Sequence, residues 1–136
     1  MTGIKCIGRD GQEREFNCSE PDIDGYGVKR YTYRIRPIAS EPIESFEFTV
    51  EEVGEDTVKV VVMDRHHEPA YSAMGIPERM IQECATTLGK KVISSNNGAN
   101  IPGEFRTPRA TKVWERLVAQ ERATFDEQQD RYTFTG

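Results

Sequence analysis

The sequence has no hydrophobic run long enough to cross a membrane. No segment approaches the ~18 apolar residues that a spanning helix needs, and the mean hydropathy is -0.66. The N-terminus MTGIKCIGRDGQ also lacks the basic stretch and apolar core that mark a secretory signal. We therefore expect a cytoplasmic protein that has no membrane partner.

Cysteine is scarce, and its spacing indicates no metal chemistry. The three cysteines are Cys6, Cys18 and Cys84, and none forms a CxxC pair or stands at zinc spacing from a histidine. We expect reduced thiols; a Cys6–Cys18 bridge across a hairpin is the alternative. Cys84 falls on the apolar stripe of a predicted helix, which favours a small buried hydrophobe over a nucleophile. The sequence predicts no metal site and no cofactor.

Positive charge is also in short supply, and it is unevenly placed. With 18 basic and 23 acidic residues the net charge is -5, which disfavours a protein that coats nucleic acid. Residues 1–70 carry 9 basic and 15 acidic side chains, whereas residues 71–136 carry 9 basic and 8 acidic ones. An acidic half and a more basic half predict docking to a protein partner or to a second copy of the chain.

The first half of the chain has the period of β-strands. Apolar and polar residues alternate over residues 29–38 and 45–53, and residues 57–64 are apolar on nearly both faces. Within residues 4–18, Asp10-Gly11 predicts a two-residue hairpin turn. Residues 19–27, with one proline and two glycines, predict a loop. These patterns indicate N-terminal hairpins and a meander.

The second half changes to the period of helices. Residues 76–91 carry apolar side chains at helical spacing, and Gly89 is placed as a stop. A second helix is predicted to begin with Thr107 as its N-cap and Pro108 in its first turn. Its apolar stripe consists of Ala110, Val113, Trp114, Leu117 and Val118.

These elements predict one fold for the whole chain. Residues 122–136 pair with themselves as a C-terminal β-hairpin. The expected class is α+β: an antiparallel β-sheet of N-terminal hairpins and a meander, packed by two amphipathic helices, with the C-terminal β-hairpin. Residues 1–136 fit a single domain, mainly β over 1–67 and with two helices plus the hairpin over 76–136.

The polar stretch SSNNGANIPGEFRTP, residues 94–108, leads directly into the second helix. Backbone N–H groups at a helix start attract anions, and arginines beside them add charge-assisted hydrogen bonds to a phosphate or carboxylate. An ordinary connection, whose serines and asparagines suit turns, is the alternative. The candidate anion-binding residues are Ser94, Ser95, Asn97, Arg106, Thr107 and Arg109.

The segment MDRHHEP places two histidines next to carboxylates at a strand end. His66 and His67, with Asp64 and Glu68, have the side chains of a metal site or a general base. Adjacent residues on a strand point to opposite faces, so the two imidazoles share a metal only if the strand has already ended. A solvated strand end is the alternative interpretation.

No catalytic constellation stands out in these patterns. We therefore expect a non-catalytic binding or regulatory module that acts through protein–protein contacts. One alternative is a small enzyme or ligand-binding protein that recognises an anionic ligand at residues 94–109. A second is winged-helix-like nucleic-acid binding, suggested by the order helix, helix, hairpin. The long connection between the helices and the acidic tip at residues 126–130 argue against this second alternative.

Overall fold

The computed structural model describes residues 2–25, 27–38, 43–96 and 106–136. None of the helices in these ranges is long and apolar enough to cross a membrane. The elements, in chain order, are β1 (Thr2–Ile7), β2 (Glu13–Cys18), β3 (Asp22–Asp24), β4 (Arg30–Pro37), β5 (Phe46–Glu52), β6 (Thr57–Asp64), the short 3₁₀ helix η1 (Pro69–Tyr71), α1 (Ile76–Leu88), β7 (Lys91–Ser94), α2 (Pro108–Ala119), β8 (Ala123–Asp126) and β9 (Arg131–Phe134).

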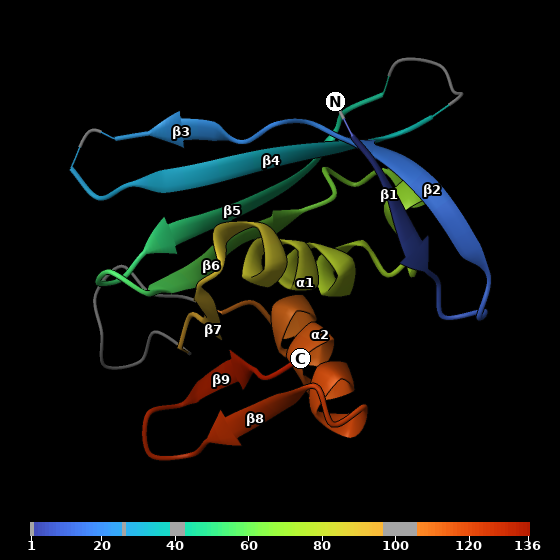
Figure 1. The fold of residues 1–136 in the computed structure, drawn as a ribbon. Coiled ribbons are helices and arrows are strands. Elements are labelled where there is room, and N and C mark those ends of the chain that lie inside the picture. Colours follow the sequence, from blue (N-terminus) through green and yellow to red (C-terminus); the bar gives the residue numbers. More distant parts are fainter. Residues whose placement is uncertain (1, 26, 39–42, 97–105) are drawn as a thin grey trace.

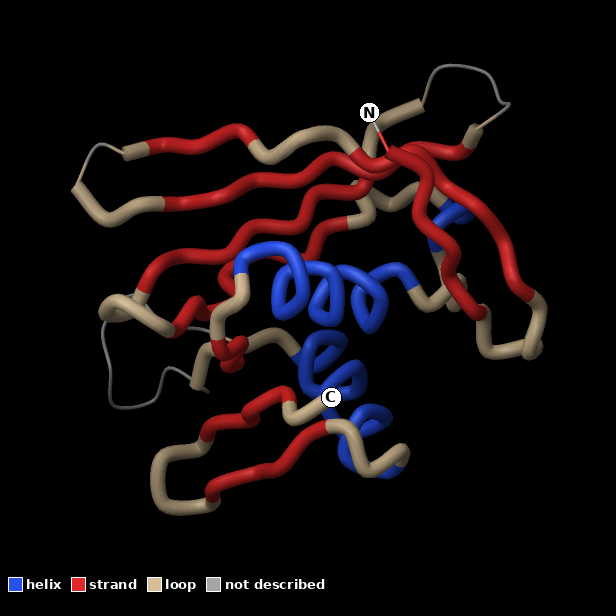
Figure 2. Tube along the Cα trace, viewed as in Figure 1, coloured by secondary structure: helices blue, strands red, loops and turns tan. Residues whose placement is uncertain are grey.

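A single mixed sheet organises the molecule. The strand order is β1-β2-β4-β5-β6-β7-β9-β8, and β3 pairs with β4. The helix α1 lies across the long strands, and α2 lies between α1 and the β8–β9 hairpin (Figures 1 and 2). The structure confirms the predicted α+β class, with two helices packed on a mostly antiparallel sheet and a C-terminal hairpin.

The strand β7 lies where the sequence predicted the end of a helix and the start of a loop. It runs parallel to β6, with Thr57 opposite Lys91 and Val60 opposite Ser94. A parallel pair needs a crossover connection, and α1 provides it. The sheet was expected to be purely antiparallel, and the parallel β6–β7 pair makes it mixed. The short β3, which pairs with β4, likewise falls inside the predicted 19–27 loop.

The β1–β2 turn is longer than the predicted two-residue turn. The Gly8 N–H donates to the Gln12 carbonyl at 3.0 Å, and the Gly11 N–H donates to the Gly8 carbonyl at 3.0 Å. Gly11 has φ 79°. This is a three-residue loop, a type I turn followed by a left-handed glycine. The Asp10 side chain stabilises it by accepting the Gln12 N–H at 3.0 Å.

The core lies between the sheet and the two helices. Tyr31, Tyr33 and Ile35 of β4 are buried, as their alternation predicts. Trp114, in the middle of α2, is fully buried and stacks on Tyr132 of β9, with ring centroids 5.8 Å apart. The packing of α2 therefore joins the C-terminal hairpin to the rest of the core.

The start of α1 approaches β1 more closely than any side chain allows. Gly75, the N-cap of α1, has φ 77°. A Cβ atom built on it would lie 2.1 Å from the Ile7 carbonyl oxygen. Only glycine fits both the left-handed conformation and this backbone contact.

We expect Gly75→Ala to destabilise the fold more than an alanine placed at another left-handed glycine. Gly54 is the matched control, because it has φ 78° and nothing within 4 Å of a built Cβ. Gly54→Ala should cost about 1 kcal/mol of strain, and Gly75→Ala about 2 kcal/mol more because backbone atoms must move. Urea unfolding measures both changes. Equal losses in the two variants would show that the Ile7 contact is not a constraint.

Candidate functional site

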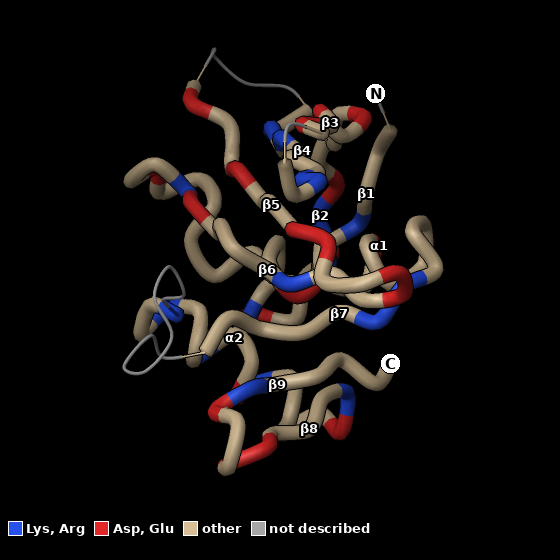
Figure 3. Tube along the Cα trace, turned by 90° about the vertical axis from the view of Figure 1, so that its left-hand side faces the viewer, with Lys and Arg blue, Asp and Glu red and all other residues tan. Residues whose placement is uncertain are grey.

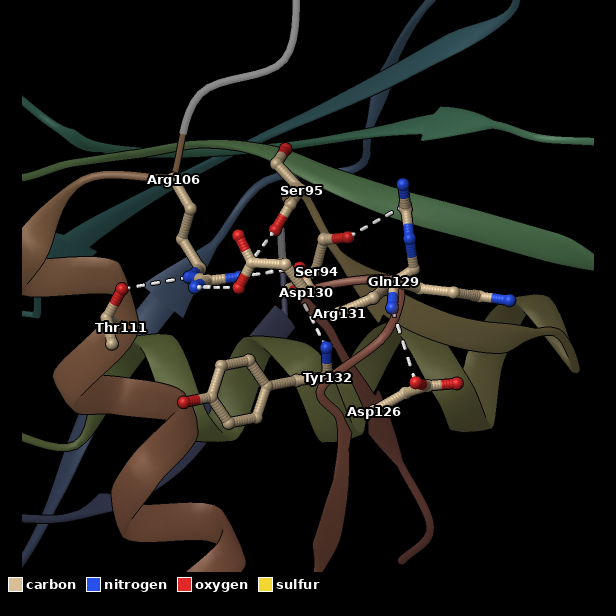
Figure 4. A network of polar contacts seen from close by, with 9 residues as sticks. All are labelled: Ser94, Ser95, Arg106, Thr111, Asp126, Gln129, Asp130, Arg131 and Tyr132. Carbon is tan, nitrogen blue, oxygen red and sulfur yellow. Dashed lines mark hydrogen bonds and ion pairs between the residues drawn. The ribbon is translucent and has the colours of Figure 1, made fainter. Parts of the chain in front are cut away.

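Arg106 lies inside the protein, where its guanidinium is bonded to neighbouring parts of the chain. Its side chain is almost completely buried, and its Nε donates to Thr111 Oγ1 at 2.8 Å. Its Nη1 donates to the carbonyls of Ser95 and Asp130, each at 3.1 Å, and its Nη2 donates to Asp130 Oδ1 at 2.9 Å. The guanidinium also lies 5.0 Å from the centroid of the Tyr132 ring. It thus joins the chain after β7, the first turns of α2 and the β8–β9 turn (Figure 4).

Ser94 and Ser95 are also buried and bonded within the sheet. The Ser95 hydroxyl donates to the Val60 carbonyl at 2.8 Å, and the Ser94 hydroxyl accepts the Tyr132 N–H at 2.9 Å. The Ser94 carbonyl accepts a hydrogen bond from Arg131 Nη1 at 3.0 Å. These serines therefore connect β7 to its neighbours.

The remaining predicted residues have separate places. Thr107 caps α2, since its Oγ1 accepts the Ala110 N–H at 3.1 Å, which confirms the predicted N-cap. Asn97 lies outside the described residues. Arg109 is exposed on the first turn of α2. The structure brings Ser94, Ser95 and Arg106 together in a structural network, and an anion site on the six residues stays a prediction.

Arg109 belongs instead to a cleft of about 340 Å³ beside α2. Five parts of the chain line it: the β1–β2 turn, the start of β5, the end of β6 with the segment that follows, the start of α1, and one side of α2. These parts are far apart in the sequence, and no local motif marks them. No local pattern groups them before the fold brings them together.

The cleft has an excess of positive charge. Five cations and two carboxylates line it, which leaves three positive charges with histidine neutral. Within α2 the cations stand three and four residues apart, so they share one face of the helix. Figure 3 shows blue segments on α2 and just beyond β6. The cations are Arg9, Arg65, Arg109, Lys112 and Arg116, and the carboxylates are Asp64 and Glu78.

The five cations differ in how their side chains are bonded. Arg116 Nη2 lies 3.0 Å from Glu78 Oε1, and Arg65 Nη1 donates to a main-chain carbonyl at 3.4 Å. Within the described parts of the chain, the side chains of Arg9, Arg109 and Lys112 form no ion pair. They remain available to a ligand that enters the cleft.

The two histidines lie beyond the end of β6, so they are not held on opposite faces of a strand. Both have positive φ, 51° for His66 and 62° for His67. His66 Nε2 is 3.3 Å from Glu47 Oε1, without the alignment of a hydrogen bond, and its Nδ1 is 3.6 Å from Asp64 Oδ2. His67 lines the cleft. Among the described side chains, no three of His, Cys, Asp and Glu converge as a metal-binding group.

The cysteines are buried, free thiols with suppressed acidity. Burial raises the pKa of Cys6 and of Cys84 to about 12 and that of Cys18 to about 11. None of the three lines the cleft. The structure confirms that Cys84 is a small buried hydrophobe.

The helix-turn-helix of a winged-helix protein is not formed by the described residues. Between α1 and α2 the chain passes through β7, and the terminal hairpin extends the sheet through the β7–β9 pair. Comparison with known proteins adds no relative: no family model, curated protein or solved structure matches the chain.

We expect the native thiols to resist alkylation. A thiol with a pKa of about 12 is thiolate in roughly one molecule in 10⁴ at pH 8, and only the thiolate reacts. Iodoacetamide at pH 8 should therefore label the cysteines in urea and leave them unmodified in the native protein, as read by mass spectrometry. Because folding keeps these thiols protonated, stability should fall as pH rises above about 9. Native Cys84 that reacts as fast as in urea would contradict this account.

We expect Arg106→Ala to destabilise the protein by about 3 kcal/mol or more. The substitution removes the donor of the hydrogen bonds to the Ser95 and Asp130 carbonyls and of the ion pair with the Asp130 carboxylate. Arg109→Ala is the matched control, since its exposed side chain forms no ion pair with the described residues, and it should change stability by less than about 0.5 kcal/mol. Chemical denaturation measures both. Equal, small effects would mean that the Arg106 network does not hold the fold together.

Proposed function

We propose that this protein is a non-catalytic binding module that holds an anionic small molecule in the cleft beside α2. The observation that carries the proposal is a set of three cations around one concave surface, Arg9, Arg109 and Lys112, whose side chains form no ion pair with the described residues. They come from two separate parts of the chain. The sequence suggested an anionic ligand as an alternative, at residues 94–109, and we place that ligand in the cleft.

Electrostatics favour an anion here despite the overall charge of -5. A concave wall of one charge sign concentrates the field and attracts ligands of the opposite sign. Arginine adds planar donors that suit phosphate or carboxylate oxygens. The cleft volume of about 340 Å³ is in the range of small-molecule sites, roughly 300 to 1,000 Å³. The cleft therefore suits a small anion better than it suits the flat surface of a protein partner.

Binding without catalysis is supported by the placement of the reactive groups. The thiols are buried and protonated. His66 lies between the carboxylates of Glu47 and Asp64 and does not line the cleft. His67 and Ser72 do line it, but among the described residues no hydrogen bond joins the serine hydroxyl to the imidazole. The protein partner expected from the charge layout stays a prediction.

Binding of inorganic phosphate tests the proposal. We expect phosphate to shift the amide NMR signals of the cleft, including those of Gly75 and Ala110, at fixed ionic strength. Lys112→Glu should weaken binding by about tenfold or more, because it replaces a charge-assisted hydrogen bond by repulsion. Lys91→Glu is the matched control: it makes the same charge change at an exposed residue of β7 outside the cleft.

Two results would overturn the proposal. One is an equal loss of affinity in Lys91→Glu and Lys112→Glu, which would mean that only net charge matters. The other is signal changes spread over all basic surfaces, with no preference for the cleft.

A further inference from the structure

Besides its cations, the cleft has an apolar floor that a bare anion would leave unused. The floor combines two aromatic rings, two methionines and one valine from β5, β6, the segment before α1, and α2. Phe46, Tyr71 and Val113 are themselves almost completely buried, so the apolar surface that phosphate alone would leave in water belongs mainly to the half-buried Met63 and Met74. An apolar lining contributes to the free energy of binding only when apolar ligand surface covers it. The floor residues are Phe46, Met63, Tyr71, Met74 and Val113.

The floor offers few polar groups to a ligand. The Tyr71 hydroxyl already donates to the Glu44 carbonyl at 2.7 Å. The Ala73 carbonyl, on the same wall, accepts the Arg9 N–H at 3.0 Å. The Tyr71 ring meets the Phe46 ring edge-on, with centroids 6.0 Å apart, and both side chains are almost completely buried, so they support the wall from behind. A ligand body rich in hydroxyl or amide groups would lose its water and gain few hydrogen bonds there.

The methionines favour an adaptable apolar body. Met63 and Met74 are partly buried and pack against the core while also lining the cleft. Methionine is unbranched and flexible, so it adjusts to ligands of different shape. Such a floor suits a hydrocarbon chain.

The charge on the rim indicates the head group. The lining residues have an excess of three positive charges. A phosphate monoester carries about -1.5 to -2 at pH 7, whereas a carboxylate carries -1. A phosphate dianion therefore matches the three excess positive charges of the rim better than a carboxylate does.

We propose that the cleft binds a phosphate monoester with an apolar body, the phosphate at Arg109 and Lys112 and the hydrocarbon against Met63 and Met74, with the buried Phe46 and Tyr71 behind them. This inference rests on the proposed anion-binding function and adds the chemical class of the ligand. It predicts that alkyl phosphates bind more tightly than nucleotides, whose sugars and bases need hydrogen-bond partners.

Calorimetry with a series of alkyl phosphates tests the inference. The probes are methyl, butyl and hexyl phosphate, with heptanoate, hexanol and adenosine monophosphate for comparison. We expect affinity to rise by about tenfold for every two methylene groups added, until the floor is covered. Hexyl phosphate should bind more tightly than heptanoate, hexanol and the nucleotide.

Variants at Met74 show whether the gain comes from the floor. Met74→Gln should remove most of the gain in affinity from methyl to hexyl phosphate. Met74→Leu, which keeps the volume and the apolar character, should retain that gain. Lys112→Glu should weaken methyl and hexyl phosphate alike. Thermal unfolding of each variant confirms that it is folded before binding is compared.

The outcomes distinguish this inference from the proposed function. If methyl phosphate binds in the cleft and longer chains bind no better, the apolar body is wrong and the anion site stands. Tighter binding of the nucleotide, or equal binding of heptanoate, would overturn the ligand class. If no phosphate binds, or if hexanol binds as tightly as hexyl phosphate and Lys112→Glu has no effect, both proposals fall.

Discussion

The buried Arg106 guanidinium is the interaction on which the position of the cleft depends. It bonds the chain after β7 through Ser95, the start of α2 through Thr111, and the β8–β9 turn through Asp130. These contacts hold the first turns of α2 against the sheet, and Arg109 and Lys112 project from those turns into the cleft. The buried Arg106 thereby holds in place the part of α2 that carries Arg109 and Lys112, whose exposed side chains form no ion pair with the described residues.

The two sides of α2 have different tasks. Trp114 and Leu117 face the core, and the stack of Trp114 on Tyr132 joins the helix to the hairpin. The basic side of the helix, together with Val113, lines a cleft whose other walls come from the β1–β2 turn, from β5 and from the chain between the end of β6 and the start of α1. Gly75 lets that chain touch β1 closely enough to close the wall. Packing and charge therefore combine to give one concave, positively charged surface on an acidic protein.

The sequence predicted most of the fold and little of the candidate site. Period-two alternation and the cap at Thr107 are local signals, and the structure confirms them. The strand β7 was missed because its four residues depend on pairing with β6, which no local pattern shows. Arg106 was expected to meet a ligand because burial cannot be read from residue type, and its partner Asp130 is 24 residues away. The cleft depends on contacts between distant segments, so only Arg109 of its cations was among the predicted site residues.

The cleft, and not the 94–108 segment, should take the anion. A crystal structure of the protein soaked with tungstate, an electron-dense analogue of phosphate, can show this, because anomalous scattering locates the ion. We expect one ordered site in the cleft, within hydrogen-bond distance of Arg109 and Lys112. An ion bound at the start of α2 beside Ser95 and Thr107, with the cleft empty, would contradict it.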